Sequence, residues 1–157
     1  MTVYFIADMH FGAEPLAGRR GFTNAAEMDE AIVAAWRSVV SDGDDVWIVG
    51  DVGDPDRLSD LPGRKRLVLG NTDKPIARYR EHASIHEVSK VARLQEQGKA
   101  LILVHKPEDA VATQNEYVVH GHIHQKTFGD PRYLCVSVDQ TGWGPIALKE
   151  VLRRLVE

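Results

Sequence analysis

Short apolar runs recur along this chain, and most of them end abruptly in glycine, a carboxylate or histidine. The run at residues 46–49 is followed at once by Gly50-Asp51, and apolar runs of this length are typical of buried β-strands. Residues 2–7 form another such run, rich in β-branched and aromatic side chains, which ends at Asp8. We therefore predict two strands, with the carboxylates in loops at their carboxyl ends, where α/β proteins bind ligands.

The same pattern predicts further strands. A proline–glycine turn at residues 62–63 leads into one of them, and the polar residues 95–99 separate two segments that a hairpin would pair. The remaining predicted strands are 66–69, 85–94, 100–104, 117–119 and 134–138.

In the long segment between the first two predicted strands, apolar side chains recur at the spacing of a helix. Met28, Ile32 and Trp36 recur every four residues, which places them on one face of a helix. Asn24 followed by Glu27 has the spacing of a capping box. We therefore predict a helix over residues 25–40 with this face in the core.

Other helical signals are shorter. Asp54-Pro55 predicts a capped helix to about residue 61, because aspartate suits the N-cap and proline suits the first helical position. Residues 74–81 and 145–156 are also predicted to be helical, whereas 11–22, with three glycines and a proline, is predicted to be a long loop. Strands that alternate with helices, without a repeat or a linker, predict one α/β domain over residues 1–157 with mixed sheets covered by helices.

Charge and composition narrow the class of protein. The formal charge of −4 and the pI near 6.0 argue against a general nucleic-acid or acidic-membrane binder, although a local basic pocket remains compatible with them. The longest apolar runs fall short of the ~18 residues of a membrane span, and the N-terminus does not resemble a signal peptide. The lone Cys135 is predicted to be a buried, inert thiol. We expect a cytoplasmic protein.

Metal-ligand side chains stand at the ends of the predicted strands. Oxygen and imidazole groups without a thiolate favour divalent ions such as Mn²⁺, Fe²⁺, Ni²⁺ or Zn²⁺. One ion would use too few of these groups, whereas two ions that share a carboxylate would use all of them and could clamp a displacement at phosphorus. Each aspartate taken alone is an ordinary turn residue, and only the whole set favours ligands. The set is Asp8, His10, Asp51, Asn71, His105, His122 and His124.

The order of these motifs resembles the calcineurin-like metallophosphoesterase superfamily, and its small bacterial and phage-type members in particular. The motifs are Asp8-x-His10, Gly50-Asp51-x-x-Asp54, Gly70-Asn71-x-Asp73, His105 and Gly121-His122-x-His124, and they span residues 8 to 124.

The resemblance implies a four-layer αββα sandwich of two mixed β-sheets flanked by helices. It also implies two divalent ions, of which Mn²⁺ is the favoured identity, and a hydroxide that bridges them and attacks a phosphate ester. Asp51 would be the ligand shared by both ions. The first ion would be held by Asp8, His10, Asp51 and His124, and the second by Asp51, Asn71, His105 and His122.

The chain departs from the family pattern at Thr72, where many members have a histidine that protonates the leaving group. Threonine donates a hydrogen bond but is no acid near neutral pH. We therefore expect Asn71, Asp51, Thr72 and Asp73 to form the catalytic loops of an enzyme that prefers phosphodiesters or activated esters, whose leaving groups need less protonation. Nucleotide-like small substrates are preferred within that class. His82 or His86 would replace the missing acid if a loop folded over the site.

Other polar residues have two interpretations each. Arg19 and Arg20 are candidates to bind substrate phosphate, but solvated arginines suit an exposed loop equally well, and Lys106 has the same two interpretations. Asp73 is predicted to orient a ligand or a loop, and Asp54 to cap a helix. His120 is either a support for the ligands or a plain strand residue.

Two competing functions remain. A non-catalytic metal-binding scaffold for protein contacts has Thr72 in its favour, but such a protein has no need of seven converging ligand groups. A nuclease is the other alternative, and the sequence shows no basic stripe or aromatic platform for a polymer. We therefore expect a small phosphate-ester substrate, no general nucleic-acid binding and no membrane contact.

Overall fold

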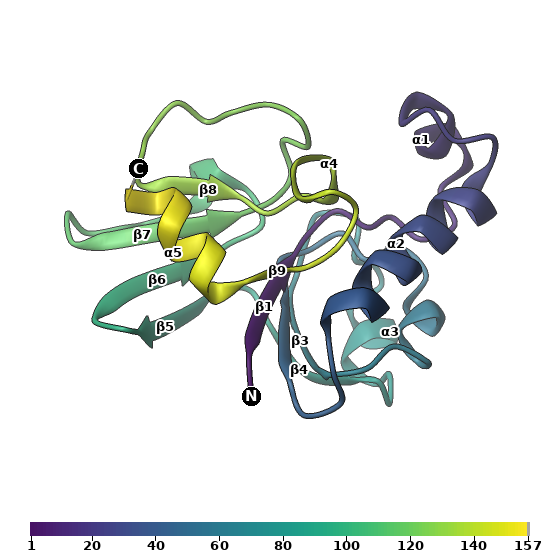
Figure 1. Cartoon of the computed structure of the whole chain (residues 1–157), viewed down its shortest axis with the longest axis horizontal. Coiled ribbons are helices and arrows are strands. Elements are labelled where there is room, and N and C mark those ends of the chain that lie inside the picture. Colours follow the sequence, from purple (N-terminus) through teal and green to yellow (C-terminus); the bar gives the residue numbers. More distant parts are fainter. Residues whose placement is uncertain (157) are drawn as a thin grey trace.

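Two mixed β-sheets face each other in the computed structural model, which describes residues 1–156 apart from the side chain of Val156 (Figure 1). The first sheet has the strand order β4-β3-β2-β1-β9, in which β1 to β4 are parallel and β9 runs antiparallel to β1. Its strands are β1 (Val3–Ile6), β2 (Asp45–Ile48), β3 (Arg64–Val68), β4 (Ile85–Ser89) and β9 (Ile146–Ala147).

The second sheet has the order β5-β6-β7-β8. Strands β5 and β6 form an antiparallel hairpin that turns at Gln97-Gly98, and β6, β7 and β8 are parallel. The strands are β5 (Ala92–Glu96), β6 (Lys99–Leu103), β7 (Glu116–His120) and β8 (Tyr133–Cys135).

Helices cover the outer face of the first sheet. Side chains alternate between the faces of a strand, so Val46 and Ile48 point to this face, where Ile32 and Trp36 pack against them. Asn24 caps the long helix by accepting a hydrogen bond from the amide of Glu27, as predicted. The covering elements are α1 (Glu14–Arg19), α2 (Ala25–Val39), α3 (Ile76–Arg80) and the 3₁₀ helix η1 (Pro55–Leu58).

The main interior lies between the sheets. Phe5 and Val49 of the first sheet region pack with Leu101, Leu103 and Val119 of the second. Helix α5 (Leu148–Val156) closes this interior through contacts with β1, β8 and β9, and it lies in front of the sheets in Figure 1. The far face of the second sheet is covered by the short 3₁₀ helix η2 (Pro107–Asp109) and the irregular chain after it. The fold is thus the expected α/β sandwich of two mixed sheets flanked by helices.

Some predicted elements were wrong. The predicted loop at 11–22 contains α1, which has Pro15 in its first turn and buries Ala17 against α2. The predicted arm 85–94 is two strands, because the chain leaves the first sheet after Ser89 and enters the second at Ala92.

The C-terminal third also differs in detail. The predicted strand 134–138 ends at Cys135, and a short helix α4 (Val138–Thr141) follows it. The predicted helix 145–156 begins with β9 and becomes helical at Leu148. Among the described residues, no helix is long and apolar enough to cross a membrane.

Candidate metal centre

The candidate ligands come from both sheets. Asp8 and His10 follow β1, Asp51 follows β2 and Asn71 follows β3, whereas His105 follows β6 and the two remaining histidines follow β7. Because these strands are parallel within each sheet, their carboxyl ends lie at a common edge, where loops of the two sheets meet. The site therefore exists only where one sheet is docked on the other.

The ligand atoms form two neighbouring groups, each with its atoms within 4.8 Å of one another. Asp8, His10 and His124 form the first group, and Asp51, His105 and His122 form the second.

One carboxylate oxygen faces both groups. Asp51 Oδ2 lies 3.4 Å from His10 Nε2 and 3.1 Å from His105 Nε2. Asn71 joins the second group, because its Oδ1 lies 3.1 Å from His122 Nδ1. The structure therefore brings all seven sequence-predicted ligands together, with Asp51 between the two groups.

The backbone at these ligands is in an unusual conformation. Asp8, His10, Asp51, His122 and His124 have φ angles between 48° and 74°, the left-handed region that side chains other than glycine rarely adopt. Among the other described non-glycine residues, only Gln97 and Trp143 share it. Such strain persists where the surrounding structure imposes it, and it concentrates at functional sites.

Two motif glycines leave room for the ligands themselves. A Cβ atom on Gly50 would lie 2.3 Å from His105 Nδ1, and one on Gly70 would lie 2.1 Å from Asp51 Oδ1. Gly50 also has a φ of 90°. The Gly-Asp and Gly-Asn pairs of the sequence are thus explained by close approach of the loops at the site.

Unpartnered polar atoms show that the residues fit bound cations. Asp8 Oδ1, His10 Nε2 and His105 Nε2 are buried and have no hydrogen-bond partner. Buried polar atoms are nearly always paired, so these three indicate a ligand between them. The donor set of carboxylates, imidazoles and an amide suits divalent metal ions of the harder and borderline kind.

The ionisation of the histidines and carboxylates follows from burial and proximity. Burial lowers the pKa of His10 to about 4, so its imidazole is neutral at neutral pH and ready to act as a ligand. Burial raises the pKa of Asp8. Burial opposes the charged forms of Asp51 and His105 as well, but their mutual contact outweighs it, so the pKa of Asp51 falls well below its usual range and that of His105 rises.

Hydrogen bonds fix which nitrogen of two histidines faces the centre. His105 Nδ1 donates to the carbonyl of Val49 at 2.8 Å, which leaves Nε2 toward Asp51. His124 Nδ1 lies 3.1 Å from Asp139 Oδ2, which leaves its Nε2 for a metal ion. A carboxylate or carbonyl partner of this kind orients metal-binding histidines and raises their basicity.

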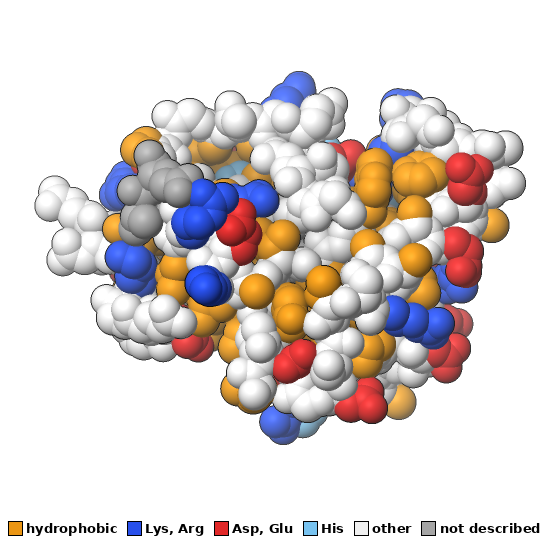
Figure 2. Space-filling model, viewed as in Figure 1, with side chains coloured by type: hydrophobic (Ala, Val, Ile, Leu, Met, Phe, Trp, Pro, Cys, Tyr) orange, Lys and Arg blue, Asp and Glu red, His pale blue; other side chains and the backbone are white. Residues whose placement is uncertain are grey.

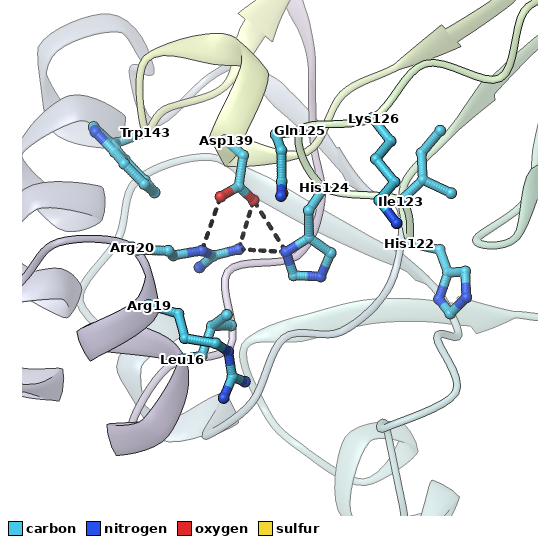
Figure 3. A pocket seen from close by; sticks show the side chains of 10 residues that line it. All are labelled: Leu16, Arg19, Arg20, His122, Ile123, His124, Gln125, Lys126, Asp139 and Trp143. Atoms are coloured by element: carbon cyan, nitrogen blue, oxygen red, sulfur yellow. Dashed lines mark hydrogen bonds and ion pairs between the residues drawn. The ribbon is translucent and has the colours of Figure 1, made fainter.

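Asp139 is the functional residue that the sequence did not indicate. It lies between Arg20 and His124 in Figure 3, and it accepts hydrogen bonds from both the Nε and the Nη2 of Arg20. Burial opposes its charge, but His124 and Arg20 hold the pKa of this carboxyl well below its usual range. No motif spacing marks it, because it follows the last predicted ligand by fifteen positions and starts no recognisable pattern.

The guanidinium of Arg20 is bound by groups of the protein and is hardly exposed to solvent. Only 3% of its side chain is exposed, and its guanidinium also donates to the backbone carbonyls of Asp8 at 2.7 Å and Met9 at 3.3 Å. These contacts occupy the groups that a substrate phosphate would need. Arg19, in contrast, is exposed and lines a cavity of about 770 Å³ beside His122 and His124 (Figure 3).

The loop after β3 is held by Asp73. This buried carboxylate accepts hydrogen bonds from the backbone amides of Gly70, Asp51 and Val52 at 2.7 to 3.0 Å. Thr72 is exposed, and its amide donates to Asp51 Oδ1 at 3.0 Å. Asp73 therefore ties two ligand-bearing loops together, and Thr72 fixes the carboxylate between the groups.

The remaining candidates have partners of their own. Asp54 caps η1, as predicted. His82 lies 3.0 Å from Asp56 and His86 lies 2.8 Å from Arg64, so neither is folded over the ligand groups. His120 is buried, and its Nδ1 donates to the carbonyl of Gly121 at 2.9 Å.

Comparison with known families gives a match over most of the chain. The model of the calcineurin-like phosphoesterase superfamily domain matches residues 1–138. The Gene 66 protein of Mycobacterium phage L5 is 39% identical over 84 residues, which cover 47% of this chain and 41% of that protein. The Gene 66 protein of Mycobacterium phage D29 is 27% identical over an alignment that covers 99% of this chain and 96% of its own length. The matched stretch is thus less than half of the phage L5 protein.

A solved structure agrees with the fold over its whole length. A protein of unknown function from Aquifex aeolicus superposes with a TM-score of 0.79 at 22% sequence identity, covering 97% of this chain and 98% of that one. At 22% identity this similarity establishes the fold alone, and the chemistry has to be inferred from the residues of the candidate site.

Proposed function

This chain belongs to the calcineurin-like phosphoesterase superfamily, and from that premise we propose that it hydrolyses phosphodiesters of small, nucleotide-like substrates with two divalent metal ions. The observation that carries the proposal is the position of Asp51 Oδ2, which faces His10 of one ligand group and His105 of the other. A carboxylate in that position suits a ligand shared by two ions.

The ligands divide between two sites. Asp51 would be common to both, and Asn71 would complete the second. The first site would consist of Asp8, His10, Asp51 and His124, and the second of Asp51, Asn71, His105 and His122. When bound at these residues, two divalent ions, Mn²⁺ by preference, would supply Lewis acidity toward the phosphate oxygens and toward a water molecule.

The chain's own groups hold this arrangement in place. The amide of Thr72 and the carboxylate of Asp73 fix Asp51 and its loop, and the carbonyl of Val49 orients His105. Arg19 is the arginine available to meet a substrate oxygen, because Arg20 is occupied by Asp139 and by backbone carbonyls.

A preference for diesters follows from the leaving group. Hydrolysis breaks a P–O bond, and the departing oxygen must be a good leaving group or must receive a proton. Thr72 lines a cavity of about 470 Å³ beside His10, and its hydroxyl cannot supply that proton near neutral pH. Aryl esters, whose leaving alcohols are acidic, are therefore favoured over alkyl monoesters, and the sugar oxygen that leaves a nucleotide-like diester would take its proton from water.

Metal analysis coupled to turnover tests the proposal. Purified protein with added Mn²⁺ is expected to bind two ions per chain and to hydrolyse bis(4-nitrophenyl) phosphate faster than an alkyl monoester. Asp51→Asn is expected to lower occupancy of both sites, whereas His10→Ala chiefly lowers one. A single ion per chain with no turnover of either ester, or equal metal loss in the two variants, would contradict it.

A further inference from the structure

Lysine and arginine side chains without a partner gather around the candidate metal centre. They line three cavities that adjoin the candidate ligands, and among the described residues none of them has a partner for its charged group in an ion pair or a hydrogen bond. They are Arg19, Lys74, Lys90, Lys106 and Lys126.

Cations elsewhere on the molecule are mostly paired. Over α5, for example, Arg153 and Arg154 bind Glu150, and Figure 2 shows this mixed cluster on the near face. Lys149 and Arg80 are exposed and also unpaired within residues 1–156, and Lys99 has only the ring of Tyr117 beside its charged group. None of these three residues lines one of the cavities. Most of the cations left free by the fold are thus placed around the site.

The three cavities share no lining residue and adjoin different candidate ligands. The cavity of about 770 Å³ adjoins His122 and His124. A second, of about 330 Å³, adjoins Asn71 and His105, and a third, of about 470 Å³, adjoins His10.

The free cations exceed what the reacting phosphate needs. Two divalent ions carry more positive charge than Asp8 and Asp51 neutralise, and the remainder already matches one phosphate group. The carboxylates in two of the cavities are also engaged, since Asp139 is bound by Arg20 and Asp54 by Arg78. The third cavity is lined by one carboxylate, Asp109, and two lysines, so its balance is also positive. The chain as a whole is negative, so the positive charge at these cavities is local and would attract an anionic ligand.

We propose that the substrate is a short single-stranded oligonucleotide, whose phosphates on both sides of the reacting diester meet the free cations of separate cavities. The proposal rests on the proposed function and names its substrate class. A mononucleotide carries phosphate at one position, whereas a strand of a few nucleotides offers separate phosphates to more than one cavity. The cavity of about 770 Å³ is also lined by Leu16, by Ile123 and by Trp143, whose ring lies 5.6 Å from the guanidinium of Arg20 (Figure 3).

The sequence could not show this charge distribution. The five cations lie far apart along the chain and form no basic run, so the sequence predicts no general affinity for nucleic acid. In the folded protein they line three separate cavities and do not form one continuous basic surface. That arrangement suits a flexible strand and does not suit the rigid, evenly charged surface of a duplex.

The test compares substrates and variants of the metal-loaded protein. The double variant Lys90→Gln/Lys126→Gln removes one cation from each of two cavities and touches no candidate ligand. Lys149→Gln is the matched control, because it removes an exposed cation away from them. Binding is measured by fluorescence anisotropy with a labelled phosphorothioate hexanucleotide, and turnover with the ordinary hexanucleotide and with bis(4-nitrophenyl) phosphate.

The double variant is expected to bind the hexanucleotide about tenfold more weakly, since exposed ion pairs contribute up to about fivefold each. The slope of log affinity against log salt should fall by about 1.4, because each phosphate that is no longer neutralised lowers it by about 0.7. Its kcat/KM should fall at least five times more for the hexanucleotide than for the aryl diester. Lys149→Gln should match the wild type in all three measurements.

Each adverse result has a distinct meaning. Unchanged hexanucleotide binding in the double variant, with normal aryl-diester turnover, overturns the substrate class and leaves the phosphodiesterase standing. A duplex bound as tightly as the single strand also overturns it. If neither ester is hydrolysed, the proposed function fails, and the anisotropy of the variants still decides whether these cations bind a strand.

Discussion

Single residues at the candidate centre are held in conformations that the unfolded chain disfavours. Five of the seven candidate ligands have left-handed backbone angles, and such residues cost about 1–3 kcal/mol each. Three of their side-chain atoms are buried without a partner. In the absence of metal, the site therefore lowers the free energy of unfolding, and packing elsewhere in the molecule must offset this loss.

Asp139→Asn is expected to weaken metal binding at the group that contains His124. An amide in place of the carboxylate loses the charge that orients His124 Nδ1, and partners of this kind typically contribute about 10- to 100-fold in metal affinity. Isothermal titration with Mn²⁺ measures the effect, and Asp54→Asn, at the cap of η1, is the control. Equal affinities in the two variants would show that Asp139 does not support the ligand.

Gly50→Ala and Gly98→Ala separate steric fit from backbone strain. Both glycines have positive φ angles, but only a Cβ on Gly50 would meet another residue, His105. Both variants bear the left-handed cost of about 1 kcal/mol, and Gly50→Ala is expected to lose at least about 2 kcal/mol more because His105 must move. Urea unfolding measures the difference, and equal losses would refute the steric explanation.

At the scale of secondary structure, α1 is attached to the site by the residue that follows it. Arg20 joins the end of α1 to Asp139 of α4 and to the loop after β1, and its guanidinium lies 5.6 Å from the ring of Trp143. This one buried side chain therefore connects the N-terminal part of the chain to a helix 119 positions away.

Arg20→Met and Arg19→Met are neighbouring substitutions with opposite expectations. Arg20→Met leaves Asp139, whose side chain is 12% exposed, without its cation, and the loss is expected to approach the lower end of the roughly 3–5 kcal/mol typical of a fully buried pair. Arg19→Met changes an exposed side chain and is expected to stay within about 0.5 kcal/mol of the wild type. Chemical denaturation of the two proteins checks this. Similar stabilities would mean that the buried contacts of Arg20 contribute little.

Elements with strong local signals were predictable. The helix α2 follows from its apolar spacing and its Asn24 cap, and the strands before Asp8 and Asp51 follow from their apolar runs. The convergence of the seven candidate ligands was predictable because their motifs are short and follow predicted strands directly.

Elements decided by tertiary contacts were not predictable. Helix α1 carries glycine and proline, and its burial of Ala17 against α2 overrides that weak propensity. The break after Ser89 depends on which sheet each half joins, which no local pattern encodes. Asp139 and Arg20 meet across 119 positions of the sequence, so only the fold reveals them as partners.

For the molecule as a whole, metal binding would be coupled to folding. The candidate ligands come from both sheets, and all of them except Asn71 have a left-handed backbone or a buried unpaired atom, so ions would bind the folded state alone. Mn²⁺ at about 100 times its dissociation constant is expected to add about 2.7 kcal/mol, which for a domain of this size raises Tm by about 5–10 °C. Differential scanning fluorimetry measures it. The same shift in Asp51→Asn would place the stabilising ion elsewhere.

Because the candidate ligands come from two sheets, bound ions would also have a structural role. Ions that join Asp8 and Asp51 to His105 and His122 would cross-link points of the chain that are separated by long stretches of sequence. A cross-link of this kind restricts the unfolded chain and disfavours it, most strongly when the closed loop is long. Small domains often use disulfides for this purpose, but here the one thiol, Cys135, is buried and its pKa is raised to about 12. The metal ions proposed for catalysis would thus also cross-link and stabilise the fold, as disulfides do in other small domains.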